Sequence, residues 1–329
     1  MRMAVKKSNH VSIKTVESPS PADGQIRVKV EACGVCGTDM WVSDEEASFG
    51  HEIAGLVDAV GTGVTRVAVG DRIVLDSATP CGACDNCRNA KQELCTDIQS
   101  FFFIESFGMA DAMIAPAISA IPFAGIAPEV ACLQEPLGVA LDVFRLADIT
   151  LDSNVLVLGA GPIGLMAVSL ATRAGARRVF AADLGTRPRR LELAREWGAN
   201  DVLDPSQIPL PDFDFGCEID RVIVTAPPRT LPDAMRVAAK GGIITFIGIE
   251  HGEGAQCTFD ANEFHFKKLQ LRASFASPAL LGATAVRMLS EGIIDGEALI
   301  SHRFPLEQIT EALDTARTDP TALKVVVTS

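Results

Sequence analysis

The hydrophobic pattern of the chain changes near residue 145. Before this point, short runs at 26–30, 53–60 and 72–75 are apolar or alternate apolar with polar residues, and glycines separate them. Alternation with a period of two is typical of strands that bury one face. The first part of the chain is therefore predicted to form an irregular antiparallel barrel or sandwich.

Beyond residue 146, apolar strand patterns alternate with helical patterns. The predicted strands are 155–158, 178–182, 221–225 and 243–247, and the predicted helices are 162–174, 188–197 and 232–240. Such alternation predicts an α/β unit with a doubly wound parallel sheet. The chain after residue 276 is rich in helical patterns and ends in an apolar run at 325–327. We therefore divide the chain into segments 1–145, 146–275 and 276–329.

The run Gly-Ala-Gly-Pro-Ile-Gly, from Gly159 to Gly164, lies between a predicted strand and a predicted helix. Gly159 permits a tight turn, Gly161 lets the backbone approach a pyrophosphate, and Gly164 lets the helix pack closely on the strand. The helix starts at Pro162, which has no N–H, and from Ile163 onward it offers free N–H groups to phosphates. This motif in this context predicts a dinucleotide-binding site.

Asp183 closes the next predicted strand, where a carboxylate accepts hydrogen bonds from an adenosine ribose. Because its charge would repel a 2′-phosphate, NAD is the expected cofactor. Arg187, Arg189 and Arg190 follow closely. These arginines either form the solvated start of a helix or include a partner for the 2′-phosphate of NADP. Arg187 is the candidate cofactor-binding residue among them.

Four cysteines have the spacing C-x2-C-x2-C-x7-C: Cys81, Cys84, Cys87 and Cys95. Four thiolates so close together saturate a tetrahedral Zn²⁺ and leave no open position, which predicts a structural zinc site. An iron–sulfur cluster is less favoured, because partner motifs for electron transfer are missing. A nucleic-acid zinc ribbon fits the spacing alone.

Composition bears on partners and compartment. The formal charge of −13, without a cluster of Lys and Arg, argues against nucleic acid as a partner. The most apolar stretch, 112–127, is too short and too interrupted by prolines to span a membrane. No secretory signal is readable at the start. Clustered thiols among nine cysteines then favour metal binding in a reduced, cytoplasmic compartment.

A second group of candidate metal ligands is scattered along the chain: Cys36, His51, Glu52 and Glu135. Taken singly, each residue has another explanation. Cys36 fits a buried thiol and His51 a core histidine, while Glu52 fits a surface charge and Glu135 a carboxylate at a helix start. Cys33 and Cys36 also fit a C-x-x-C redox pair, although no thioredoxin-like context surrounds them. Spacing alone leaves the role of this group open.

Read in order, the motifs resemble those of the zinc-containing medium-chain dehydrogenases. They are Cys-Gly-Val-Cys-Gly-Thr-Asp at 33–39, Gly-His-Glu-x-x-Gly-x-Val-x-x-Val-Gly at 50–61, Gly-Asp-Arg at 70–72, the four cysteines and the glycine run. The resemblance extends to residues 301–306. Glu-Pro-Leu at 135–137 is similar to the sorbitol and glucose dehydrogenase branch, in which a carboxylate replaces a third sulfur ligand.

The resemblance implies a fold and a set of metal ligands. The fold is a GroES-like catalytic domain at 1–145, completed by the return segment 276–329, around a Rossmann NAD-binding domain at 146–275. Cys36 and His51 correspond to ligands of a catalytic zinc, and Glu52 to a third or exchangeable ligand. Glu135 would bind directly or through water. About two zinc ions per chain are expected, one of them structural.

The resemblance also implies a mechanism. Thr38 corresponds to the hydroxyl that relays the substrate proton, and Asp39 to the carboxylate that orients the histidine. The expected reaction is zinc-dependent oxidation of a secondary alcohol of a polyol or sugar, with hydride transfer to NAD. The alternatives are a threonine-type amino-alcohol dehydrogenase, a simple alcohol dehydrogenase, and a non-catalytic nucleotide-binding protein with a structural zinc.

Other features concern the assembly and the substrate pocket. The family forms dimers or tetramers, often by pairing strands of the coenzyme domain, and 243–247 is the candidate strand. The segment between Cys36 and His51 is shorter than in relatives and is acidic at 43–47, and the chain has no tyrosine. The aromatic residues at 41, 49 and 101–103 either line the pocket or are ordinary core and surface residues.

Overall fold

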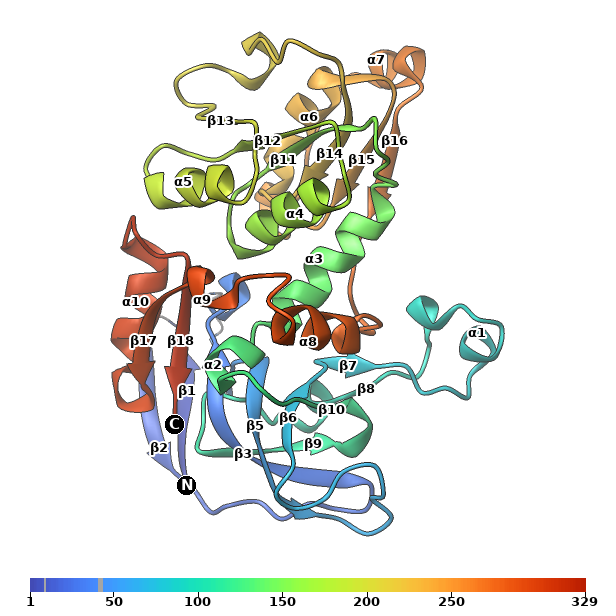
Figure 1. The fold of residues 1–329 in the computed structure, drawn as a ribbon. Helices are drawn as coiled ribbons and strands as arrows, with labels where there is room; N and C mark the ends of the chain where they lie inside the picture. Colours follow the sequence, from blue (N-terminus) through green and yellow to red (C-terminus); the bar gives the residue numbers. More distant parts are fainter. Residues whose placement is uncertain (9, 41–43) are drawn as a thin grey trace. The chain divides into compact units, whose positions relative to one another are not determined.

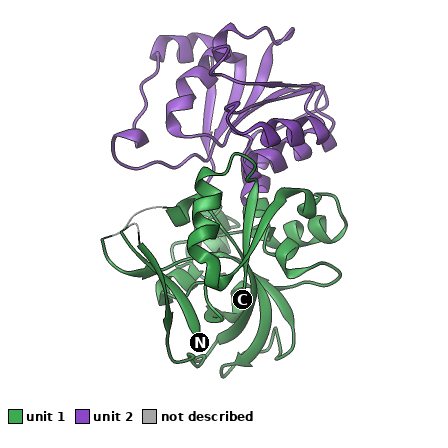
Figure 2. Cartoon of the chain, turned by 90° about the vertical axis from the view of Figure 1, so that its left-hand side faces the viewer, with its two compact units in different colours: residues 1–138, 276–329 green, residues 139–275 purple. Residues whose placement is uncertain are grey.

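A computed structural model describes residues 1–8, 10–40 and 44–329. The chain forms two compact units, residues 1–138 with 276–329, and residues 139–275 (Figure 2). The chain leaves the first unit within one helix, α3 (Gln134–Leu146), and returns to it after residue 275. Both ends of the chain therefore build the unit that holds the candidate metal residues.

A seven-stranded sheet is the main element of the first unit in the described part of the chain (Figure 1). Six of its strands follow the order β10, β6, β5, β3, β18, β17, and β9 also pairs with β3. A second sheet has the order β2, β1, β4, and β7 pairs with β8. The strand bounds are β1 (Arg2–Lys7), β2 (His10–Thr15), β3 (Gln25–Gly34), β4 (Ala47–Ser48), β5 (Glu52–Val60), β6 (Arg72–Leu75), β7 (Ala78–Thr79), β8 (Gln99–Ser100), β9 (Ala112–Pro116), β10 (Ala120–Pro122), β17 (Ile300–Pro305) and β18 (Lys324–Thr328).

The predicted alternation of apolar residues produces the core of this unit. Ile26, Val28 and Val30 of β3 are all buried, and they pack in one cluster with side chains of the other strands. The last strand, β18, pairs with β3 so that Val326 lies opposite Gly34. The helices of the unit are η1 (Gly37–Met40), α1 (Asp85–Arg88), η2 (Gln92–Leu94), η3 (Phe101–Ile104), η4 (Ala117–Ser119), α2 (Pro128–Ala131), α8 (Gly282–Ser290), α9 (Gly296–Leu299), η8 (Leu306–Gln308) and α10 (Ile309–Thr318).

The second unit contains the predicted parallel sheet, with six strands in the order β13, β12, β11, β14, β15, β16. All five residues of β11 are buried, as expected of a strand covered on both faces. The strands are β11 (Asn154–Leu158), β12 (Arg178–Ala182), β13 (Asp201–Leu203), β14 (Ile219–Val224), β15 (Ala238–Phe246) and β16 (Gln270–Ala273). The helices are α4 (Pro162–Arg173), α5 (Pro188–Glu196), η5 (Leu210–Asp212), η6 (Pro228–Thr230), α6 (Leu231–Val237), η7 (Gly252–Ala255) and α7 (Ala261–Lys267).

The predicted helix at 232–240 is too long. Helix α6 ends at Val237, and strand β15 already begins at Ala238, which pairs with Ile219. The register shifts before Ile243 pairs with Arg221, so the glycines that were expected to end the helix lie in an irregular part of the strand. Gly241 has a φ of +82°, which a glycine adopts without strain.

The strand at 243–247 is also the wrong candidate for pairing between subunits. It belongs to β15, which is bonded to β14 on one side and to β16 on the other, so its hydrogen-bonding edges are occupied. The strand at the end of the sheet is β16, with the sequence Gln-Leu-Arg-Ala. Its short mixed sequence has no apolar run that would reveal it.

The described residues contain no membrane-spanning candidate. Their helices lack the combination of length and apolar character that crossing a bilayer needs.

Candidate metal and coenzyme sites

Strand pairing brings Cys36, His51 and Glu52 together. Cys36 follows the end of β3, and Glu52 begins β5, where it lies opposite Gly34 of β3. The antiparallel register therefore closes the gap between two motifs that are separate in the sequence. The ligand atoms of the three side chains all lie within 4.8 Å of one another. A thiol, an imidazole and a carboxylate form a donor set that suits Zn²⁺.

Asp39 connects the two segments that carry these side chains. Its Oδ2 accepts a hydrogen bond of 2.8 Å from the backbone N–H of Cys36, and its Oδ1 lies 3.8 Å from Nδ1 of His51. Asp39 is only 4% exposed, and burial raises its pKa. This placement suits a carboxylate that fixes the orientation of a histidine ring.

The charges around His51 favour a cation. Burial alone would lower the pKa of His51, but the Cys36 thiol and the carboxylates of Glu135 and Asp39 raise it well above its usual value. Groups that hold a proton on an imidazole also attract a metal ion at the same place. The residues present therefore fit a zinc site by their chemistry.

Glu135 is the second residue of α3 and is half-buried. Burial raises its pKa to about 7, against the opposing effect of His51, while Glu52 raises it further. Its carboxyl group is thus close enough to interact electrostatically with His51 and Glu52. It is outside the compact group of three, which is compatible with binding through water or after a small side-chain movement.

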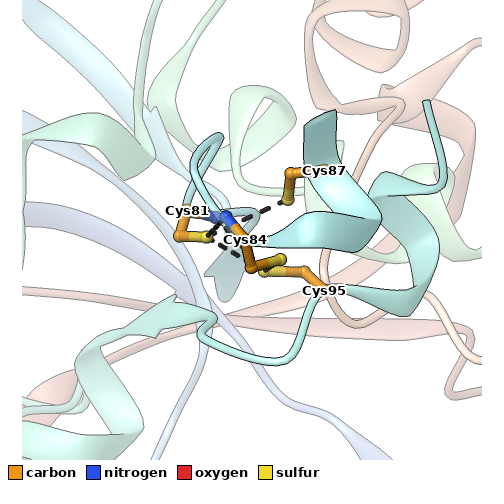
Figure 3. Close-up of side chains that lie close together, drawn as sticks. All are labelled: Cys81, Cys84, Cys87 and Cys95. Atoms are coloured by element: carbon orange, nitrogen blue, oxygen red, sulfur yellow. Dashed lines mark hydrogen bonds between the residues drawn. The ribbon is translucent and has the colours of Figure 1, made fainter. Parts of the chain in front are cut away.

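The four clustered cysteines converge on one point (Figure 3). Their sulfur atoms are 3.6 Å apart for Cys81 and Cys95, 3.8 Å for Cys84 and Cys95, and 4.0 Å for Cys81 and Cys87. Four sulfurs at about 2.3 Å from a zinc ion would lie roughly 3.8 Å from one another. Backbone N–H groups of Cys87 and Thr96 lower the pKa of Cys84 to about 6, which favours its thiolate.

The glycine run adopts the conformation that its spacing predicts. Gly159 has a φ of +95°, a region that favours glycine. A Cβ on Gly164 would lie 1.8 Å from the carbonyl oxygen of Gly159, so only glycine lets α4 pack against this turn. A Cβ on Gly161 would have nothing closer than 4.0 Å. The backbone at Gly161, just before α4 begins at Pro162 and Ile163, therefore leaves room for a pyrophosphate.

Asp183 lies next to this turn. It follows β12, and its Oδ2 accepts a hydrogen bond of 3.0 Å from the backbone N–H of Ala160. The carboxylate is thus held at the end of the strand adjacent to β11, where a ribose recognised by such a motif would bind.

Comparisons with known proteins agree with this arrangement. The family description "Alcohol dehydrogenase GroES-like domain" matches residues 22–129, and "Zinc-binding dehydrogenase" matches residues 162–290. The L-threonine 3-dehydrogenase of Saccharopolyspora erythraea is 30% identical over 340 residues, which cover 96% of each chain. The chain belongs to the zinc-containing medium-chain alcohol/polyol dehydrogenase family.

Two further relatives extend the comparison for this dehydrogenase. The L-galactonate-5-dehydrogenase of Escherichia coli K12 is 28% identical over 316 residues, covering 92% of this chain and 90% of the relative. The solved structure of a dehydrogenase (rspB) from E. coli CFT073, complexed with NADH, has a TM-score of 0.90 and 30% identity, covering 100% of this chain and 99% of that one. The predicted GroES-like and Rossmann fold is confirmed, and the chain is an oxidoreductase.

The arginines after Asp183 have different surroundings. Arg189 forms an ion pair with Glu196, as expected of a solvated helix start. Arg187 lies at the N-terminal boundary of α5, and its role in cofactor binding stays a prediction. Arg190 lies 3.3 Å from Oδ2 of Asp183, and its Nε is buried without a hydrogen-bond partner among the described residues. The dehydrogenase therefore places Arg190 beside the carboxylate of Asp183.

Lys324 is a site residue that the sequence analysis missed. It begins β18, and its ammonium group donates to the carbonyl oxygen of Val35 at 2.9 Å and to the carboxylate of Glu52. A Cβ on Gly34 would lie 2.0 Å from Oε2 of Glu52, so glycine is needed to leave room for the buried pair. Only the pairing of β18 with β3 reveals this residue, because it is 272 positions from Glu52.

The aromatic candidates are divided between the core and the site. Phe49 and Phe101 are buried in the core of the first unit, whereas Phe103 is 69% exposed. The ring of Phe102 lies 5.8 Å from that of His51 and stacks on Phe101. Phe102 is therefore the member of the group that borders the candidate metal site. Trp41 and the start of the acidic segment 43–47 lie outside the described residues.

Proposed function

We propose that this dehydrogenase oxidises a secondary alcohol of a polyol or sugar to a ketone and transfers the hydride to NAD. The observation that carries the proposal is the compact group of Cys36, His51 and Glu52, with Glu135 nearby, in a chain that also has a complete dinucleotide-binding turn. The name of the relative L-galactonate-5-dehydrogenase supports a polyhydroxylated substrate.

Zinc would be held by Cys36, His51 and a carboxylate. Glu52 suits the role of an exchangeable ligand, because Lys324 competes for its carboxylate. Glu135 would then be the ligand that stays bound to the zinc ion. When bound, zinc supplies a Lewis acid that lowers the pKa of the substrate hydroxyl. The cysteines at 81, 84, 87 and 95 would hold the second, structural zinc.

The remaining site residues orient groups and move a proton. Thr38, half-buried in η1 one residue before Asp39, would accept the proton of the substrate hydroxyl and pass it towards solvent. Asp39 would hold the ring of His51. Phe102 would exclude water on one side of the substrate.

NAD is the proposed hydride acceptor. The pyrophosphate would bind at Gly159, Gly161 and the start of α4, and Asp183 would accept hydrogen bonds from the adenosine ribose. Arg190 is paired with Asp183 and would be available to a 2′-phosphate only if that pair were broken. NADP is accordingly the weaker cofactor in this proposal.

The proposed assembly is a homodimer or homotetramer in the cytoplasm. Strand β16 lies at the end of its sheet, and large apolar side chains near it are exposed, with Phe266 at 71% and Phe275 at 75%. An exposed edge strand with apolar neighbours favours pairing with a second copy. The nine cysteines are all free of disulfide bonds, which suits a reducing compartment.

A second candidate is a threonine-type amino-alcohol dehydrogenase, which the relative of that name favours. A panel of polyols, sugars, sugar acids and amino alcohols, each assayed with NAD and NADP by absorbance of the reduced nicotinamide, separates the two. The proposal expects the highest kcat/KM with NAD and a polyhydroxylated substrate. Turnover confined to amino alcohols would replace it with the second candidate.

A further inference from the structure

A buried carboxylate is hydrogen-bonded to the residue that precedes Glu135. Asp76 follows the end of β6 and is 8% exposed, and Gln134, the first residue of α3, is 2% exposed. Nε2 of Gln134 donates a hydrogen bond of 2.8 Å to Oδ1 of Asp76. The backbone N–H of Asp76 donates to the carbonyl oxygen of Ser119, which fixes the main chain at this position.

A third element closes over this pair. Gly282 is the first residue of α8, and a Cβ there would lie 2.2 Å from Oδ1 of Asp76 and 2.6 Å from Nε2 of Gln134. The end of β6, the start of α3 and the start of α8 therefore meet within contact distance. Helix α3 carries the chain out of the first unit, and α8 is the first helix after the chain returns to it.

The hydrogen bond fixes the residue next to Glu135. Consecutive residues of a helix point about 100° apart, so one side chain of the first turn can be anchored while its neighbour projects elsewhere. Gln134 is anchored on Asp76, and Glu135 lies close enough to His51 and Glu52 for their charges to act on its pKa. Holding Gln134 thus fixes both the position and the rotation of the helix start that presents Glu135.

We propose that Asp76 and Gln134 are positioning residues, which hold the first turn of α3 so that Glu135 reaches the catalytic zinc. This inference rests on the proposed function. The pair acts through Glu135 and touches neither the metal nor the substrate. Groups that orient metal ligands typically change metal affinity by about 10- to 100-fold when they are removed, so the effect is measurable.

The acceptor of this hydrogen bond is a buried carboxyl group. Burial raises the pKa of Asp76 to about 7, and the hydrogen bond from Gln134 and the charge of Arg66 act against this rise. A buried carboxylate in place of an apolar residue has a stability cost. A role in holding the ligand-bearing helix gives a physical reason for its presence.

The experiment measures metal binding rather than turnover. Gln134→Leu and Asp76→Ala remove the hydrogen bond, whereas Asp76→Asn keeps an acceptor oxygen for Nε2 of Gln134. Gln207→Leu, at an exposed glutamine of the second unit, is the matched control. Each protein is loaded with zinc and titrated with a chelator, and the cobalt-substituted proteins are compared by their visible spectra.

The first two variants should lose metal from the Cys36 site about 10- to 100-fold more readily than the original protein, and their cobalt bands should change. Asp76→Asn and Gln207→Leu should bind metal as the original protein does. The four-cysteine site and NAD affinity should remain unchanged in all four variants, which shows that both units are folded.

Unaltered metal affinity and an unaltered cobalt spectrum in Gln134→Leu would overturn the inference. A variant that fails to fold is replaced in the same assay by Gln134→Met, which keeps the volume and lacks the donor. If the original protein itself binds metal only at the four cysteines, the proposed function fails. If it binds two ions and the variants hold both with the same affinity, only the positioning role fails.

Discussion

The ammonium group of Lys324 and the carboxylate of Glu52 form an ion pair in which the two side chains are 4% and 1% exposed. Lys324 also binds the backbone just before Cys36, so one side chain contacts both segments that carry candidate zinc ligands. The last strand, β18, thereby stabilises a site whose other residues all come from the first half of the chain.

Removing one member of this pair should destabilise the first unit. Lys324→Met leaves the Glu52 carboxylate buried without its partner, and we expect a loss of about 3 to 5 kcal/mol in the free energy of unfolding. The double variant Lys324→Met with Glu52→Gln removes both charges and should recover most of this loss. Chemical denaturation measures both, and additive losses in the double variant would argue against a coupled pair.

Asp183 and Arg190 should together set the preference between cofactors. Asp183→Gly removes the ribose acceptor and releases Arg190 for a 2′-phosphate, so kcat/KM with NAD should fall about 10- to 100-fold while that with NADP rises. Adding Arg190→Ala should remove the gain with NADP. Steady-state kinetics with both cofactors measure the ratio. An unchanged ratio in Asp183→Gly would contradict this role.

Substitutions at two glycines of the dinucleotide-binding turn should have different effects, one on the stability of the second unit and the other on NAD affinity. Gly164→Ala places a methyl group within 1.8 Å of a backbone oxygen, so thermal unfolding of the second unit should occur at a clearly lower temperature. Gly161→Ala meets nothing within the protein closer than 4.0 Å, so it should keep its stability but bind NAD more weakly. Equal losses of thermal stability in Gly164→Ala and Gly161→Ala would contradict this separation of roles.

Asp76 should give the protein a stability that falls as the pH rises. Its pKa is near 7 in the folded chain, against an ordinary value of 3.8, so the folded state binds the extra proton between these values. Stability from this group is therefore fully present below pH 4 and lost as the pH rises to 7. Between pH 5 and pH 8 the change should be about 2 to 3 kcal/mol.

Asp76→Asn isolates this effect, because the amide does not titrate. The difference in unfolding free energy between the variant and the original protein should shift in favour of the variant from pH 5 to pH 8. The groups that act on Asp76 are Gln134 and Arg66, and both are present in the two proteins. A difference that is constant with pH would show that Asp76 has an ordinary pKa.

The parts of the site that are local in the sequence could be predicted from it. The turn from Gly159 to Gly164 and the lobe of four cysteines depend on residues a few positions apart, and their conformations follow from glycine sterics and thiolate spacing. The β-rich and parallel-sheet units also follow from the periods of apolar residues. The family descriptions confirm the same two folds.

The parts that depend on distant pairing could not be predicted. Lys324 meets Glu52 only because β18 lies beside β3, and Gln134 meets Asp76 only because α3 begins over the end of β6. The contact of Arg190 with Asp183 depends on the path of the turn between β12 and α5, which spacing in the sequence does not give. The edge strand β16 is too short to leave a pattern in the sequence.

The central claim is that Cys36, His51 and a carboxylate hold a second zinc ion. Elemental analysis of the purified, zinc-replete protein tests it directly, with Cys36→Ala as the companion variant. The account predicts about two zinc ions per chain in the original protein and about one in the variant, with NAD affinity largely retained. One zinc ion in both proteins would contradict it.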